Sequence, residues 1–101
     1  MGKIGEWLSK LFGVKQERIV KGKEIGKITH YYGHLNVGII ELSDALKVDD
    51  KIRIKGYTSD FTQDVKSIQI EHANVPEGKR GDMVGIKVSQ KVHPHDKVYK
   101  L

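Results

Sequence analysis

The sequence predicts a small all-β domain, a six-stranded antiparallel β-barrel, with a short amphipathic helix before it. After residue 23, apolar and polar residues alternate in short runs, which is typical of half-buried strands. Glycine, proline, asparagine and aspartate separate these runs, as turns require. Closure of such a sheet into a barrel would also remove exposed strand edges, which promote aggregation.

Residues 1–23, which we call the leader, precede the predicted barrel. Apolar side chains recur there at the spacing of one helical face: Ile4, Trp7, Leu8, Leu11 and Phe12. A helix of about ten residues is marginal alone in water, so this face needs a surface to pack on. We expect that surface to be the domain itself or a second copy, which would form a homodimer. A protein partner and a membrane surface are the alternatives.

Residues 24–101 form the predicted barrel domain. Its six strands are expected at 24–32, 35–42, 51–56, 64–73, 82–90 and 97–101. Two breaks in the apolar alternation indicate irregular backbone. Val65 and Ile68 are out of phase, so we expect a bulge near Ser67. The adjacent Ile39 and Ile40 indicate a bend in the second strand.

The stretch VPEGKRGDMVGIKVSQ, residues 75–90, predicts a turn that leads into a strand. Gly78 and Gly81 give the backbone the freedom that a turn needs. Asp82 begins the alternating run, and turn preferences favour a carboxylate that stabilises the turn over an acid, a base or a metal ligand.

Four stretches of the predicted barrel resemble a known family. They are GKI at 26–28, LKVDDKIRIKG at 46–56, VKSIQIEH at 65–72 and EGKRGDMVGIKV at 77–88. Their order resembles the second domain of translation elongation factor Tu, and most of all the stand-alone proteins described as translation elongation factor-like. It is also similar to the C-terminal barrel of collagenase-like peptidases. The resemblance covers residues 24–101, and Asp49 stands where the family usually has glycine.

The resemblance implies a barrel of the elongation factor Tu domain 2 type. In that family the stretch at 77–88 helps to close the barrel: Gly81 and Asp82 set the tight turn, and Gly85 allows close backbone approach. The resemblance also implies a non-catalytic binding module connected with translation, with RNA, the ribosome or a translation factor as its partner. The alternative is a protein-interaction barrel that docks on a separate enzyme, such as a collagenase-like peptidase.

The charge distribution bears on the RNA hypothesis. The chain has a net charge of +5, of which the leader carries +4 and residues 24–101 only +1. The barrel therefore lacks the strong basic signal of a phosphate-binding surface.

Catalytic motifs are absent from the sequence. It contains no GxxxxGK[ST] loop, no GxSxG elbow and no cysteine, and we therefore predict no enzymatic activity, no catalytic residue and no cofactor. It also contains no run of 18 apolar residues, so we expect a soluble cytoplasmic protein without stable membrane association.

Histidines are the remaining candidate ligands for a metal. His93, His95 and Asp96 cluster near the C-terminus, and His30 and His34 lie near the first predicted hairpin. Their spacing matches no zinc motif, so we predict no metal site. His30 would share a face with Ile28 in a regular strand, and we expect it at the edge of the core.

A candidate recognition loop lies between the third and fourth predicted strands. Its residues are Tyr57, Thr58, Ser59, Asp60 and Phe61. Two aromatic residues in a polar loop suit recognition, because loops on a rigid scaffold often bind ligands. The alternative is that Phe61 fills one end of the barrel.

Overall fold

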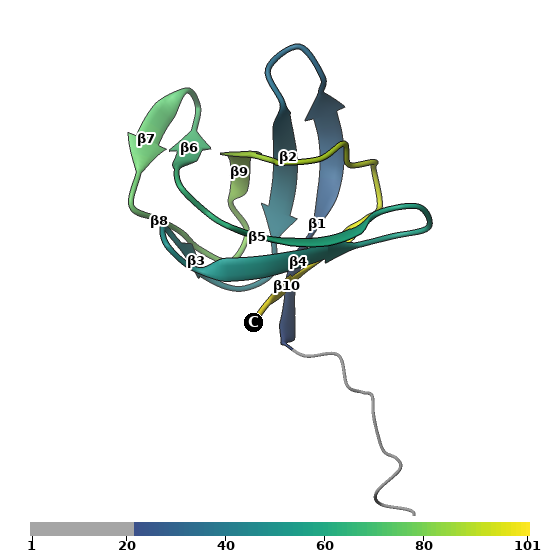
Figure 1. The fold of residues 1–101 in the computed structure, drawn as a ribbon. Coiled ribbons are helices and arrows are strands. Elements are labelled where there is room, and N and C mark those ends of the chain that lie inside the picture. The colour runs from purple at the N-terminus through teal and green to yellow at the C-terminus, as the bar shows by residue number, and fades with distance from the viewer. Residues whose placement is uncertain (1–21) are drawn as a thin grey trace, which may run out of the picture.

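The computed structural model describes residues 22–101, and every regular element in this range is a β-strand (Figure 1). The strands are β1 (Lys23–Tyr32), β2 (Val37–Leu42), β3 (Leu46–Lys47), β4 (Lys51–Lys55), β5 (Asp60–Asp64), β6 (Ile68–Ile70), β7 (Ala73–Val75), β8 (Glu77–Gly78), β9 (Met83–Lys87) and β10 (Lys97–Lys100). The all-β prediction is confirmed for these residues. The predicted helix at Ile4 to Phe12 lies outside them. No helix within residues 22–101 could cross a membrane.

The prediction of a closed six-stranded barrel is wrong, because the main sheet is open. Its eight strands follow the order β5-β4-β10-β1-β2-β9-β6-β7, and β3 and β8 form a separate pair. Residues 65–67 leave the ladder after β5 and bond to a turn instead. Asp49 N donates to Val65 O at 2.7 Å, and Val65 N donates to Asp50 O at 2.9 Å. Strand β5 therefore keeps a free edge, although the sheet curves around the core (Figure 1).

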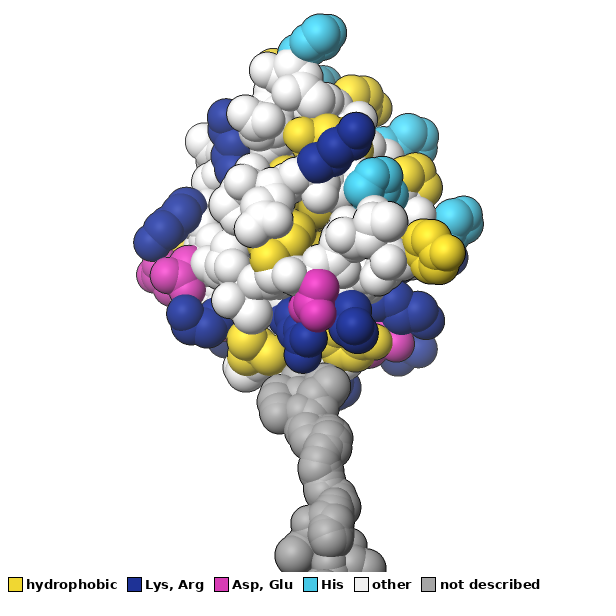
Figure 2. Space-filling view, turned by 45° about the vertical axis from the view of Figure 1, so that its right-hand side comes forward, with side chains coloured by type: hydrophobic (Ala, Val, Ile, Leu, Met, Phe, Trp, Pro, Cys, Tyr) yellow, Lys and Arg dark blue, Asp and Glu magenta, His cyan; other side chains and the backbone are white. Residues whose placement is uncertain are grey.

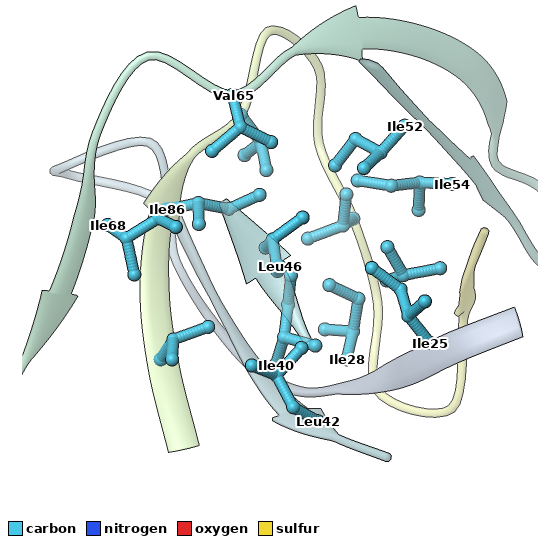
Figure 3. Close-up of a cluster of buried hydrophobic side chains, with 14 of the residues drawn as sticks. Ile25, Ile28, Ile40, Leu42, Leu46, Ile52, Ile54, Val65, Ile68 and Ile86 are labelled. Atoms are coloured by element: carbon cyan, nitrogen blue, oxygen red, sulfur yellow. The ribbon is translucent and has the colours of Figure 1, made fainter. Parts of the chain in front are cut away.

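The concave side of the sheet encloses an apolar core built mainly from β-branched residues (Figure 3). Strand alternation directs one side chain in two inward, and Ile and Val suit this packing. The core residues labelled in Figure 3 are Ile25, Ile28, Ile40, Leu42, Leu46, Ile52, Ile54, Val65, Ile68 and Ile86. Burial of each such side chain contributes about 1.5–3 kcal/mol, so the core stabilises the curved sheet.

Neither of the two irregularities expected from the sequence occurs where it was predicted. No strand crosses Ser67, and the predicted strand 64–73 is replaced by the short strands β6 and β7. Strand β2 is regular, with Ile40 buried and Ile39 on the opposite face. The bulge lies in the partner strand β1, where the register shifts between Ile28 and His30.

Candidate functional site

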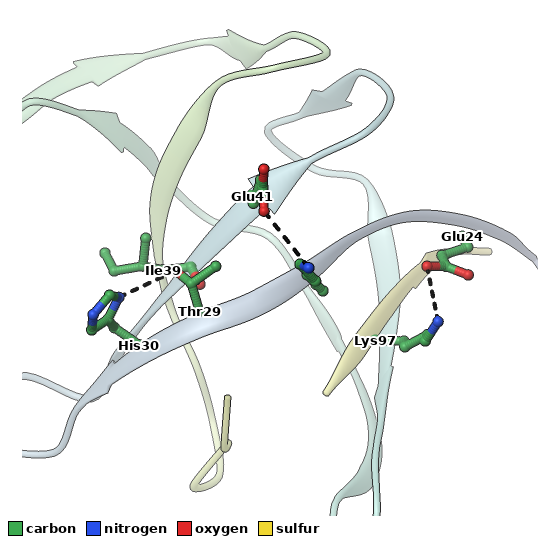
Figure 4. Close-up of polar contacts among 7 residues, drawn as sticks. Glu24, Thr29, His30, Ile39, Glu41 and Lys97 are labelled. Carbon is green, nitrogen blue, oxygen red and sulfur yellow. Dashed lines mark hydrogen bonds and ion pairs between the residues drawn. The ribbon is translucent and has the colours of Figure 1, made fainter. Parts of the chain in front are cut away.

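The bulge in β1 turns two aromatic side chains to the outer face of the sheet. Ile28 pairs with Ile40 and His30 pairs with Ile39, so Thr29 is the extra residue. The Thr29 hydroxyl donates to Ile39 O at 3.4 Å, and its oxygen lies 3.3 Å from His30 Nδ1 (Figure 4). The expectation that His30 lies at the core edge is therefore wrong, because the bulge reverses the phase of the strand and leaves His30 exposed.

His30 and Tyr32 stack on each other on this outer face. Their ring centroids are 6.2 Å apart and the rings are inclined by only 6°. Tyr31, between them, packs against the core. The two nearly parallel rings form a flat aromatic wall beside β2.

Strand register aligns three rows of side chains across the outer face, because directly opposed residues of antiparallel strands share a face. The rows are Lys27–Glu41–Met83, His30–Ile39–Gly85–Gln69 and Tyr32–Val37–Lys87. Apolar residues occupy the middle of this surface, where a half-exposed sheet usually carries polar ones.

The second row, together with Tyr32, Val37 and Met83 from the other two, lines an apolar groove of about 590 Å³. Its lining includes Tyr32, Leu35, Val37, Ile39 and Met83. Gly85 keeps the floor open, since a Cβ there would lie 3.4 Å from both Ile39 Cδ1 and Val37 Cγ1. The volume falls within the usual range for binding sites, about 300–1,000 Å³. Figure 2 shows histidine side chains beside hydrophobic ones in the upper part of the domain.

A strained hairpin tip completes one side of the groove. Ile70 pairs with Ala73, so Glu71 and His72 form the two-residue turn between β6 and β7. Both adopt left-handed backbone, with φ of 51° and 69°, and both line the groove. Such turns favour Asn-Gly or Asp-Gly, and non-glycine residues in this conformation cost about 1–2 kcal/mol each. Strain of this kind is concentrated at functional sites.

The predicted recognition loop does not act as one exposed surface. Tyr57 is fully exposed and Thr58 is exposed, whereas Ser59 is buried and Phe61 packs in the core. In this conformation Phe61 therefore offers no surface to a ligand.

Asp60, in the same loop, is held by an ion pair. Its two carboxylate oxygens accept hydrogen bonds from Arg53 Nε at 2.8 Å and Arg53 Nη2 at 2.9 Å. These bonds lower the pKa of Asp60 and raise that of Arg53.

Ser59, His93 and Asp96 lie close together but lack the geometry of a catalytic triad. Ser59 Oγ is 3.2 Å from His93 Nδ1, and Asp96 Oδ2 is 3.8 Å from the same nitrogen. A triad needs the hydroxyl and the carboxylate on different ring nitrogens. Asp96 Oδ2 also accepts a hydrogen bond from His93 N at 2.9 Å, so the cluster ties two loops together.

Histidine ligands do not converge in the described residues. Between residues 22 and 101, no three His, Asp or Glu side chains are placed to hold a metal ion. His34 and His95 are exposed, and His95 adopts left-handed backbone with φ of 78°.

Of the predicted turn residues, Gly81 and Asp82 lie where the chain enters β9, whereas Gly78 ends β8 and Gly85 lies within β9. Gly81 has φ of 91°, and Lys79 N donates to Asp82 Oδ2 at 2.8 Å. A Cβ on Gly78 would approach the Leu42 and Val84 side chains at 2.8 Å. Of the four glycine and aspartate candidates, only Gly85 contacts the groove.

Sequence reasoning missed the groove residues Leu35, Val37, Ile39 and Met83. One signal was present, because two adjacent isoleucines at 39 and 40 place an apolar side chain on each face of a strand. The bulge in β1 that aligns Tyr32 with Val37 left no comparable mark on the sequence.

Comparison with known proteins relates the chain to parts of peptidases. It is 40% identical over 79 residues to an uncharacterized protease of Methanocaldococcus jannaschii, a match that covers 77% of this chain and 19% of that protein. It is 33% identical over 102 residues to a collagenase of Porphyromonas gingivalis, with 98% of this chain and 24% of the collagenase covered. The chain thus spans about a fifth to a quarter of the length of these relatives. No protein-family profile matches the chain.

Solved structures show the same fold in a peptidase domain. The C-terminal domain of a putative U32 peptidase from Geobacillus thermoleovorans superposes with a TM-score of 0.74 at 17% identity, and the match covers 88% of this chain and 99% of that domain. Its selenomethionine variant superposes with a TM-score of 0.75 at 17% identity, with 77% of this chain and 99% of that chain covered. At this identity the likeness concerns the fold alone.

The comparisons overturn the expectation of a translation-associated, RNA-binding module. The similar proteins are proteases, collagenases and a U32 peptidase domain. The likeness to collagenase-like peptidases is supported, whereas that to elongation factor Tu is not shown.

Proposed function

We propose that this chain is a non-catalytic protein-interaction module that docks on a peptidase of the U32 or collagenase-like class. The observation that carries the proposal is the match of 77% of the chain, at 40% identity, to only 19% of a protease. A segment of that size leaves room in the relative for a separate catalytic part. The isolated U32 domain of the same fold supports an autonomous accessory unit.

The geometry of the described residues supports a binding role more than a catalytic one. The buried Ser59 and Asp96 face the same nitrogen of His93, so the serine lacks a base that is held in the orientation of a triad. The groove, in contrast, combines stacked aromatic rings with a flexible methionine. Aromatic residues and methionine are enriched in the centres of protein interfaces.

Docking can be tested with the protease of Methanocaldococcus jannaschii. The region that this chain matches is deleted, and the truncated protease is titrated into the fluorescently labelled chain while anisotropy is recorded. We expect saturable binding to the truncated protease and weaker binding to the intact one, whose own copy of the region occupies the docking surface.

A matched pair of variants locates the surface. Met83→Lys places a charge in the groove and should weaken binding, whereas Tyr57→Lys places it on an exposed loop outside the groove and should not. Absence of binding to the truncated protease would contradict the proposal. Peptide hydrolysis by the isolated chain would contradict its non-catalytic part.

A further inference from the structure

The groove exposes apolar side chains that no other part of residues 22–101 covers. Tyr32, Leu35 and Met83 retain 50%, 59% and 47% of their accessible surface. Contiguous exposed apolar surface of this kind usually marks a place where another segment docks.

As a helix, the leader would carry an apolar face whose length fits this groove. Residues 3–12, as a helix, would span about 15 Å. Strand register places Met83 level with Lys27 and Val37 level with Tyr32. The groove therefore extends along about five residues of β1, or about 17 Å.

The chain between residues 3–12 and β1 is long enough to reach the groove. Met83 lies two strands across from Lys27, five residues beyond Gly22. This separation is about 20 Å, from about 3.3 Å per residue along a strand and about 4.8 Å between strands. Residues 13–21 can extend to about 30 Å.

We propose that the leader of the same chain docks in this groove and places the apolar side chains of Trp7, Leu8 and Leu11 against Tyr32, Leu35 and Met83. The inference goes beyond the proposed function, because the contact forms within the isolated chain; a peptidase that docks in the same groove would have to displace the leader. The proposed contact gives the apolar face of the leader a surface to pack on, which a helix of this length needs in order to be stable in water.

Trp7 is the sole tryptophan of the chain, so its fluorescence reports directly on this contact. Acrylamide quenching of Trp7 is measured in the full chain and in three variants, Leu35→Glu, Met83→Lys and Tyr57→Glu. We expect protected Trp7 in the native chain and in Tyr57→Glu. The two groove variants should reduce the docking equilibrium constant about tenfold, or about 1.4 kcal/mol, and expose Trp7.

Unchanged far-ultraviolet circular dichroism is the control for folding, since all three substituted side chains are exposed. Quenching that is equally strong in the native chain and the groove variants would overturn the proposal. Protection that decreases on dilution would also overturn it, because it would show that the leader docks on a second copy. Leu11→Glu in the leader should reproduce the effect of Leu35→Glu, and failure to do so would count against the contact.

Discussion

Gln63 on β5 is joined to Ser89, beyond the end of β9, by its side-chain amide. Gln63 Oε1 accepts a hydrogen bond from Ser89 N at 2.8 Å, and Gln63 Nε2 donates to Lys87 O at 2.8 Å. These bonds connect the free edge of β5 to the opposite side of the curved sheet, where no backbone ladder forms. One side chain thus does part of what ladder bonds do in a closed barrel.

Replacement of Gln63 by alanine should therefore destabilise the domain. Two hydrogen bonds are lost, each of which contributes about 0.5–1.5 kcal/mol, so we expect a decrease of about 1–3 kcal/mol in the free energy of unfolding. Urea denaturation measures it. Gln69→Ala is the matched control, because the exposed Gln69 amide bonds only to Asn74 Oδ1, at 3.3 Å. Equal stability of the two variants would show that Gln63 contributes nothing special to closure.

Gly56 lies against the buried carboxylate of Asp96, and we expect Gly56→Ala to be strongly destabilising. A Cβ at Gly56 would overlap the side chain of Asp96, a residue with only 3% of its surface exposed. Displacement of that carboxylate strains the packing and breaks its bond from His93 N. The expected loss is about 2–3 kcal/mol, measured by thermal unfolding. Gly33→Ala is the control, since its Cβ would meet Tyr31 Cε2 at an ordinary 3.5 Å.

The pair of Arg53 and Asp60 predicts a small dependence of stability on pH. Hydrogen bonds from Arg53 lower the pKa of Asp60 in the folded state. The carboxylate therefore stabilises the fold above its unfolded pKa, and this contribution is lost as the pH falls through the lower folded pKa. Because the pair is partly exposed, it is worth only about 0.5–1 kcal/mol.

Asp60→Asn should accordingly be less stable than the native chain at neutral pH, and the difference should shrink as the pH falls through the lowered folded-state pKa of Asp60. Urea denaturation across this range measures the difference. Arg53→Gln should produce the same loss, and the double variant should lose no more than either single one. A difference that persists unchanged in acid would exclude the ion pair as its cause.

The sequence predicted the strands with clear alternation and failed where alternation is short. The predicted strands at 24–32, 51–56 and 97–101 agree with β1, β4 and β10 to within one residue at either end. Strand β5 was missed because Phe61 is its only large apolar residue. Strands β6 and β7 have three residues each, too few for a pattern to emerge.

The groove could not be predicted, because it depends on pairings between distant segments. Its floor joins Ile39 to Gly85 and Gly85 to Gln69, three residues on three strands. The turn residue Asp49 illustrates the opposite case. It has φ of 81°, a backbone conformation that favours glycine, and a local comparison with the elongation factor pattern already marked it as a substitute for glycine.

At the hairpin tip beside the groove, we expect Glu71 and His72 to favour docking at the expense of stability. Both residues occupy left-handed backbone, which costs about 1–2 kcal/mol for a residue with a Cβ. His72→Gly should remove this strain and raise stability by about 1 kcal/mol, or about 4–8 °C in the midpoint of thermal unfolding for a domain of this size. Ala73→Gly, in the adjacent strand β7, is the control and should lower the midpoint, because glycine there only adds conformational freedom to the unfolded chain. If His72→Gly stabilises the domain and also weakens binding of the truncated protease, the backbone strain is retained for docking. If His72→Gly destabilises the domain, the His72 side chain makes contacts that outweigh the backbone strain.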